Sequence, residues 1–333
     1  MEEAIRIRYN GSILAEAVAR YAIDPAQLET LPAFESYLYE FQRADAQYVL
    51  RLSHSLRRSA ALIHVEVDWI NFLHRGGAGV ARAVASPQGQ LVEAIDDGHG
   101  GQFLATAFVR APGTHPRLAD LWQPPLAVDY GRLIGRIHAL STRYQVPNPA
   151  WARPRWDAAG MMDVARWLPP DDEPVLERHR ALMAYLRGLP QDHGYGMIHQ
   201  DAHGGNFFVD EAGQITLFDF DDCVHGHFIY DIAMVIFYAV VNQPEPEAII
   251  SNFLPHFGRG YRQAYNLAAS WLPEIPYFLK LREIDLYAVI HRSFDVNAID
   301  NQWVAQFMTG RRQRLVEGIP FLDVDFRTLW LQG

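Results

Sequence analysis

The sequence is almost without lysine and cysteine. Lys280 is its only lysine, so arginine supplies 28 of the 29 basic side chains. A P-loop requires the lysine of G-x-x-x-x-G-K-[ST], and that motif is absent here, which excludes nucleotide binding of the P-loop type. The single cysteine, Cys223, excludes an internal disulfide and is typical of a protein from a reducing compartment.

Long hydrophobic runs are also missing. The longest apolar run, Ile232 to Val241, has ten residues and is too short to span a bilayer. The N-terminus, MEEAIRIRYN, lacks the apolar core of a signal peptide. The formal net charge of −10 argues against nucleic acid as a partner. We therefore expect a soluble, cytoplasmic protein without a membrane partner, long enough to form two lobes.

The most informative stretch is a polar loop, His199 to Asn206, followed by two short apolar segments with a turn between them. This pattern predicts a β-hairpin over residues 207–218. Asp201 and Asn206 lie on the loop and Asp219 follows the hairpin, so we expect the three side chains to meet at one end of it. Such a set suits phosphoryl transfer: Asp201 would accept the proton of an attacking hydroxyl, and the other two would offer oxygen ligands to the magnesium of ATP.

The same stretch resembles the catalytic loop and metal-binding strand of the aminoglycoside phosphotransferase and choline kinase-like family, relatives of the protein kinases. That family has a loop of the form H-x-D-x-H-x-x-N and an aspartate run after the hairpin. The matching residues here are His199, Asp201, His203, Asn206, Asp219 and Asp221, and the later Y-D-I-A run begins at Tyr230. The resemblance implies that His199, Asp201 and His203 are catalytic residues and that ATP and Mg²⁺ are the cofactors.

A metal-dependent hydrolase is an alternative interpretation of the loop. His199, Asp201 and His203 alternate and would serve as metal ligands with the help of His225 and His227. This interpretation leaves the asparagine of the loop and the length of the hairpin unexplained.

Arg51 departs from the pattern of the kinases. Its strand, YVLRL, resembles the kinase strand V-A-I-K, whose lysine holds the α- and β-phosphates and pairs with a helix glutamate. The next predicted helix, capped by Ser59, places Glu66 on an apolar face, where a carboxylate needs a cation. We expect Arg51 to pair with Glu66 and to hold the phosphates. The competing outcome is a nucleotide-binding regulator with impaired chemistry.

The resemblance also implies the fold class, an α+β, bilobal protein kinase-like fold. Residues 1–109 would form an N-lobe with a small antiparallel sheet and one key helix. Residues 110–113 would be the hinge, and residues 114–333 a larger, mostly helical C-lobe with the catalytic loop and the acceptor pocket. Among the helices, we expect a first one capped by Ser12 and a late one over residues 302–316.

Three further nucleotide contacts are implied by the family. Backbone groups of Val109 and Ala111 at the hinge would meet the adenine. Ser36 lies in a strand that the alternation of aromatic and polar residues predicts over residues 34–41; the family often has a serine-bearing turn there, and Ser36 would contact the phosphates. The predicted activity is transfer of the γ-phosphate of ATP to a hydroxyl of a small molecule, such as an aminoglycoside or a choline- or homoserine-like metabolite, or of a protein serine or threonine. The acceptor, the preference for ATP or GTP and the oligomeric state stay open.

Overall fold

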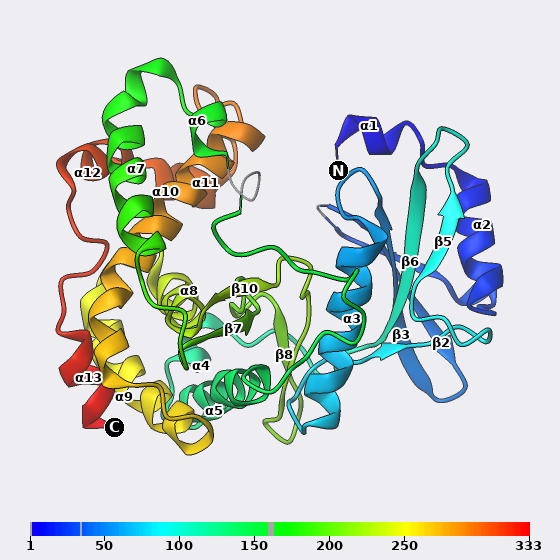
Figure 1. Ribbon diagram of the computed structural model, residues 1–333, viewed down its shortest axis with the longest axis horizontal. Coiled ribbons are helices and arrows are strands. Elements are labelled where there is room, and N and C mark those ends of the chain that lie inside the picture. The colour runs from blue at the N-terminus through cyan, green and yellow to red at the C-terminus, as the bar shows by residue number, and fades with distance from the viewer. Residues whose placement is uncertain (1, 34, 159–162) are drawn as a thin grey trace.

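The computed structural model describes residues 2–33, 35–158 and 163–333. Its N-terminal part, up to the end of the last sheet strand, is built on a six-stranded sheet, and the remainder is mostly helical (Figure 1). Strand β6 ends at Val109, where we placed the boundary between the two lobes. The mixture of sheet and helix agrees with the predicted α+β class.

The large sheet is antiparallel, with strand order β1-β2-β3-β6-β4 and with β5 paired to β6. Its strands are β1 (Glu29–Leu31), β2 (Tyr37–Arg43), β3 (Ala46–His54), β4 (Ala83–Val84), β5 (Glu93–Asp96) and β6 (Gln102–Val109). The alternation of aromatic and polar residues predicts this strand over residues 34–41. Strand β2 starts at Tyr37, and Phe34 lies outside the described residues.

Both faces of this sheet are covered, because apolar side chains of β6 point alternately to either side. Phe103 packs in a cluster with helix α2 (Gly11–Arg20), whereas Leu104 packs in another with helix α3 (Ala60–Arg75). A short helix, α1 (Glu3–Arg6), lies on the side of α2. The sheet is thus held between α2 and α3, and α3 faces the helical part (Figure 1).

Two predicted helix starts have different outcomes. The Ser59 hydroxyl accepts from the backbone N–H of Leu62, which confirms the cap of α3. The cap predicted at Ser12 is wrong: α2 begins at Gly11, and its cap is Asn10, whose side chain accepts from the N–H groups of Ser12 and Ile13. Asparagine is as good a cap as serine, and the earlier residue takes the role.

The C-terminal part consists of helices around two short β-ladders. The ladders pair β7 (Tyr195–Ile198) with β10 (Val224–His227) and β8 (Phe207–Val209) with β9 (Ile215–Leu217). The helices are α4 (Leu118–Leu121), α5 (Pro124–Ser141), α6 (Val164–Trp167), α7 (Glu173–Arg187), α8 (Phe228–Val240), α9 (Pro246–Ala264), α10 (Ile275–Ser293), α11 (Gln302–Met308), α12 (Arg311–Glu317) and α13 (Phe326–Gln332).

The apolar run that begins at Ile232 forms most of α8, which is buried over nearly its whole length in the main core. Within the described ranges, no helix combines the length and the apolar character needed to cross a membrane. The single helix predicted over 302–316 is instead two helices, α11 and α12. Gly310 has φ 66° between them, a left-handed conformation that interrupts a right-handed helix.

Helices α5 and α9 pack closely because glycines lie at their contact. A Cβ on Gly260 of α9 would lie 1.8 Å from the carbonyl oxygen of Val128 of α5, and one on Gly131 would lie 1.9 Å from that of Phe257. These approaches involve backbone atoms, which cannot move without separating the helices. Helix α8 packs against both of these helices.

We expect Gly260→Ala to destabilise the protein, because its methyl group would push α5 and α9 apart. The free energy of unfolding should fall by roughly 1–3 kcal/mol. Thermal denaturation followed by circular dichroism measures it. Gly11→Ala is the matched control: Gly11 opens α2 and has no atom within 4 Å of its Cβ position. Equal melting temperatures for Gly260→Ala and wild type would show that the helices tolerate a wider spacing.

Candidate active site

The β8–β9 hairpin brings the predicted oxygen ligands to one place. Asn206 precedes β8, and the N–H of Phe218, just after β9, donates to the Asn206 carbonyl at 2.8 Å. Asp219 is therefore next to the residue that is bonded to Asn206. This backbone bond joins the loop to the end of the hairpin, as the prediction requires, and a shared site for the side chains of Asn206 and Asp219 stays a prediction.

Asp201 lies beside Asn206 on the loop. The Asn206 amide donates to the Asp201 carbonyl at 2.8 Å and to its carboxylate at 3.1 Å. Because the amide nitrogen of Asn206 is committed to Asp201, its Oδ1 is left to accept or to coordinate. The arrangement joins the predicted proton acceptor and a predicted metal ligand in one rigid unit.

The loop is held in a strained conformation. Gln200 has φ 69° and Asp219 has φ 61°, values that non-glycine residues adopt at an energetic cost. The Asp231 carboxylate, in the first turn of α8, accepts from the N–H groups of His199 at 2.9 Å and Gln200 at 2.6 Å. Asp231 thus orients the loop from the start of α8. Strain that is enforced by a buried carboxylate is typical of a functional site.

His199 is fully buried and links the loop to the end of the hairpin. Its Nδ1 accepts from the Asp201 N–H at 3.2 Å, which assigns the proton to Nε2, and Nε2 donates to the Phe218 carbonyl at 3.1 Å. Burial lowers the pKa of His199, so the ring is neutral. Both ring nitrogens are engaged with the backbone, so we infer that His199 positions Asp201.

His203 approaches Asp201 directly. Its Nε2 lies 3.4 Å from the Asp201 carboxylate, its Nδ1 accepts from the Gly205 N–H at 2.9 Å, and its ring packs against Tyr238. On the other carboxylate oxygen, Arg282 of α10 lies at 3.4 Å and also donates to the Tyr238 hydroxyl. Burial opposes ionisation of Asp201, but His203 and Arg282 outweigh it and hold its pKa below the usual range. Asp201 is ionised at neutral pH.

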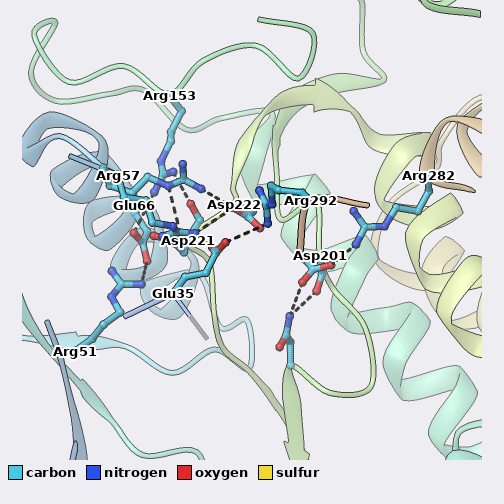
Figure 2. A network of polar contacts seen from close by, with 12 residues as sticks. Glu35, Arg51, Arg57, Glu66, Arg153, Asp201, Asp221, Asp222, Arg282 and Arg292 are labelled. Atoms are coloured by element: carbon cyan, nitrogen blue, oxygen red, sulfur yellow. Dashed lines mark hydrogen bonds and ion pairs between the residues drawn. The ribbon is translucent and has the colours of Figure 1, made fainter. Parts of the chain in front are cut away.

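Arg51 and Glu66 form the predicted ion pair. Arg51 Nη1 lies 2.7 Å from Glu66 Oε1, and the side chains are 7% and 0% exposed. The second oxygen of Glu66, however, binds Arg153 at 3.0 Å (Figure 2). One carboxylate thus pairs with two arginines, one at each oxygen. The Nε and Nη2 atoms of Arg51 are buried and have no hydrogen-bond partner among the described protein atoms, so two donors of the guanidinium are unsatisfied.

More arginines surround the residues after Asp219. Arg57 forms an ion pair with Asp221, and Arg58 lies 2.6 Å from the Asp222 carboxylate. Arg57 also contacts Glu35, in the turn before β2, and Glu35 lies 3.7 Å from Arg292 of α10 (Figure 2). Burial raises the pKa of Asp221, but the arginines around it prevail and hold it below its usual range.

Ser36 is next to Glu35 in the same turn, and no contact of its hydroxyl is described. Its role stays a prediction. At the predicted hinge, the Val109 N–H donates to the Arg82 carbonyl at 2.9 Å, so an adenine contact at Val109 would have to use its carbonyl. Ala111 is buried three residues before Thr114, whose N–H and C=O bond to Val209 of β8.

Asp219 has the properties of a cation ligand. Its side chain reaches solvent, while the surrounding protein desolvates it and the nearby carboxylates of Asp221 and Asp222 repel its charge. These effects raise the pKa of Asp219 to about 6, despite the attraction of Arg51. The ionised form of a carboxylate in these surroundings is stabilised when a cation binds it. Asn206 is linked to the neighbouring Phe218 by a backbone bond, and the carboxylate and amide oxygens of Asp219 and Asn206 are donors of the kind that magnesium prefers.

The alternative metallohydrolase site is not formed. Within the described residues, no three His, Cys, Asp or Glu side chains are placed to hold one metal ion. His199 is bonded to the backbone, and His227 is buried among aromatic rings. Cys223 is buried too, and desolvation raises the pKa of its thiol to about 12.

Comparison with known proteins agrees with this geometry. The model of the phosphotransferase enzyme family matches residues 28–272. Amicoumacin kinase of Bacillus subtilis (strain 168) is 36% identical over 329 residues, which are 97% of each chain. The chain belongs to the phosphotransferase enzyme family.

Further relatives extend the similarity of this phosphotransferase to kinases of other small molecules. Hydroxylysine kinase of Danio rerio is 23% identical over 248 residues, 68% of each chain. A solved amicoumacin kinase in complex with AMP-PNP, Ca²⁺ and Ami has a TM-score of 0.92 and 34% identity, covering 99% of this chain and 100% of that one. A microcompartment-associated aminopropanol kinase has a TM-score of 0.75 and 21% identity, covering 93% and 98%.

These similarities confirm the protein kinase-like fold and the predicted activity. The phosphotransferase is an ATP-dependent kinase that acts on a hydroxyl group, and its relatives are kinases of small molecules. Its cofactors are ATP and a divalent cation, and the solved relative is in complex with AMP-PNP and Ca²⁺. The geometry of the site also argues against impaired chemistry, because the arginine in the lysine position has its glutamate partner.

Several site residues were missed by the sequence analysis. Arg153 lies 87 positions from Glu66, and Arg282 lies 81 positions from Asp201, so neither shares a motif with its partner. Arg57 and Arg58 carried a weak signal, since they follow the strand of Arg51 as an adjacent pair.

The raised pKa of Asp219 makes the proposed magnesium site of the phosphotransferase sensitive to acid. Above about pH 6 the carboxylate is ionised and open to the cation, whereas below it a proton competes with the cation. We expect the affinity for Mg²⁺ with bound nucleotide to fall as pH drops from 7 to 5. Titration calorimetry at subsaturating Mg²⁺ measures it. Asp219→Asn should bind Mg²⁺ weakly and with little change over this range. If its affinity fell with pH as steeply as that of wild type, Asp219 would not be the titrating ligand.

Proposed function

We propose that this kinase phosphorylates a hydroxyl group of amicoumacin or of a closely similar small molecule. The observation that carries the proposal is whole-chain similarity: 97% of the chain aligns with the amicoumacin kinase of Bacillus subtilis at 36% identity. The solved amicoumacin kinase supports it with a TM-score of 0.92 over 99% of this chain. The aminopropanol kinase, at 21% identity, supports the fold alone.

A cavity beside the catalytic loop is the proposed acceptor site. Its volume is about 480 Å³. It is lined mainly by histidine, aromatic, aliphatic and amide side chains, among them His115, His203, Tyr238, Asn242, Trp303 and Gln306. The lining, all of which lies in the described part of the chain, contains no Asp, Glu, Lys or Arg. This composition favours an acceptor whose bulk is neutral or aromatic over one that is a polycation along its length.

The roles that we propose follow from the geometry of the site. Asp201 is the general base, because it is ionised and lies next to His203 at the edge of the acceptor cavity. Asn206 and Asp219 hold magnesium, which, when bound, neutralises charge on the transferred phosphoryl group.

The remaining residues act on the nucleotide or on the base. Arg51, held by Glu66, binds the phosphates, with Ser36 near them and the backbone at Val109 and Ala111 facing the adenine. His199 orients Asp201. The chain itself therefore contributes positioning and charge compensation more than covalent chemistry.

Two measurements test this proposal. The purified protein, with ATP and Mg²⁺, is offered amicoumacin, spectinomycin, aminopropanol, hydroxylysine and choline, and ADP release and acceptor mass are followed. We expect amicoumacin to gain one phosphoryl group and to have the highest kcat/KM. Preferred turnover of another acceptor would overturn the assignment of amicoumacin and leave the kinase activity intact.

Asp201→Asn should lower kcat by on the order of 10²–10⁴-fold, because the amide cannot accept the proton. Its affinity for AMP-PNP should stay near that of wild type, since Asp201 faces the acceptor. Asp210→Asn serves as the control, because Asp210 lies in the exposed hairpin turn and bonds only to its own turn. Equal kcat values for Asp201→Asn and wild type would remove Asp201 from the role of base.

A further inference from the structure

Arg153 bridges two parts of the active site that are far apart in the sequence. Its Nη2 lies 3.0 Å from Glu66 Oε2 on α3, and its Nη1 donates to the Asp221 carbonyl at 2.7 Å (Figure 2). Its side chain is 2% exposed. A guanidinium that is buried to this degree and bonded in two directions has a defined position.

The two acceptors lead to different halves of the ATP site. The other oxygen of Glu66 binds Arg51 at 2.7 Å, and Arg51 is the proposed cation for the phosphates. The Asp221 carbonyl lies two residues beyond Asp219, the proposed magnesium ligand, whose backbone is in a strained conformation. The Arg153 guanidinium therefore connects Arg51, through Glu66, to the turn of Asp219, through Asp221.

The segment that carries Arg153 is held by both parts of the molecule. On one side, Trp151 stacks on His64 of α3 with 4.6 Å between the ring centroids. On the other, the Trp156 N–H donates to the His225 carbonyl at 2.8 Å, and the His225 N–H donates to the Pro154 carbonyl at 2.9 Å, so the segment pairs with β10. Because of these contacts, Arg153 cannot move together with α3 alone or with the turn after β9 alone.

Neutralising Glu66 does not by itself require Arg153, because Arg51 already pairs with that carboxylate. The bond to a backbone carbonyl adds no charge compensation either. What Arg153 supplies is a fixed distance between α3 and the turn after β9. A lysine ammonium, a single compact donor group on a flexible stem, would not hold both acceptors in the same way.

We propose that Arg153 is a positioning residue that couples the phosphate-binding Arg51 to the magnesium-binding Asp219, so that nucleotide and magnesium reinforce each other's binding. The inference rests on the roles proposed above for Arg51 and Asp219, and it makes no use of the acceptor. Loss of the guanidinium should therefore weaken the mutual reinforcement itself, beyond any general loss of stability.

The test measures the binding of AMP-PNP by calorimetry, with Mg²⁺ and with EDTA, for wild type, Arg153→Lys and Arg153→Ala. The ratio of the two affinities is the magnesium enhancement, and we expect it to fall about tenfold in Arg153→Ala. Arg153→Lys should lie nearer to alanine than to wild type. Methylguanidinium added to Arg153→Ala should restore part of the enhancement, because it fills the vacated site.

Arg311→Ala is the matched control. Arg311 is also a buried arginine that bonds a glutamate, Glu283, and a backbone carbonyl, that of Phe307, but it lies outside the ATP site. It should lower the melting temperature and leave the enhancement unchanged. If Arg153→Ala does the same, Arg153 is a packing residue and the proposal is overturned. If Arg153→Ala does not fold, the enhancement in Arg153→Lys decides in the same way.

The design separates this proposal from the assignment of function. Binding of AMP-PNP needs no acceptor, so a wrong acceptor leaves the test unaffected. If wild type itself showed no magnesium enhancement, the role of Asp219 would fall. If wild type shows the magnesium enhancement and Arg153→Ala retains it, only the proposed coupling through Arg153 is contradicted.

Discussion

The rest of the site depends on the ion pairs that the Glu66 carboxylate forms with two arginines. This carboxylate is completely buried and is shared by Arg51 and Arg153. Removing one partner of a buried ion pair costs about 3–5 kcal/mol, because the other charge is left without compensation. The position of α3, the direction of Arg51 and the placement of the turn after β9 therefore depend on one another.

This interaction explains how a kinase site works with almost no lysine. An ammonium group would meet one oxygen of the glutamate and one phosphate as a point charge. The guanidinium of Arg51 binds Glu66 through Nη1 and keeps Nη2 and Nε free of partners within the described protein atoms. Different N–H groups of the planar guanidinium can thus donate to the carboxylate and to a phosphate. Arg57 and Arg58 likewise form ion pairs with the acids after Asp219, where arginine again takes the place of lysine.

How far the sequence predicts this site depends on the distance along the chain between the interacting residues. The loop, the hairpin and the Arg51–Glu66 pair were predictable, because local periodicity and fixed spacing determine them. The contacts of Arg153 and Arg282 were not, since they form only when segments more than 80 residues apart are packed together. The prediction of a single helix over 302–316 was wrong for a local reason. Gly310 adopts a left-handed conformation, which a periodic apolar pattern does not reveal.

The most direct measurement of this account is the dissociation constant of AMP-PNP with Mg²⁺ for Glu66→Gln, beside that for Glu93→Gln. Glu93 is also a buried acid with an arginine partner, Arg20 at 3.0 Å, but it lies on the opposite face of the sheet. The account predicts a loss of affinity of roughly tenfold or more for Glu66→Gln and an unchanged affinity for Glu93→Gln. Equal affinities in the two variants would contradict it, because the phosphates would then be held without the buried carboxylate.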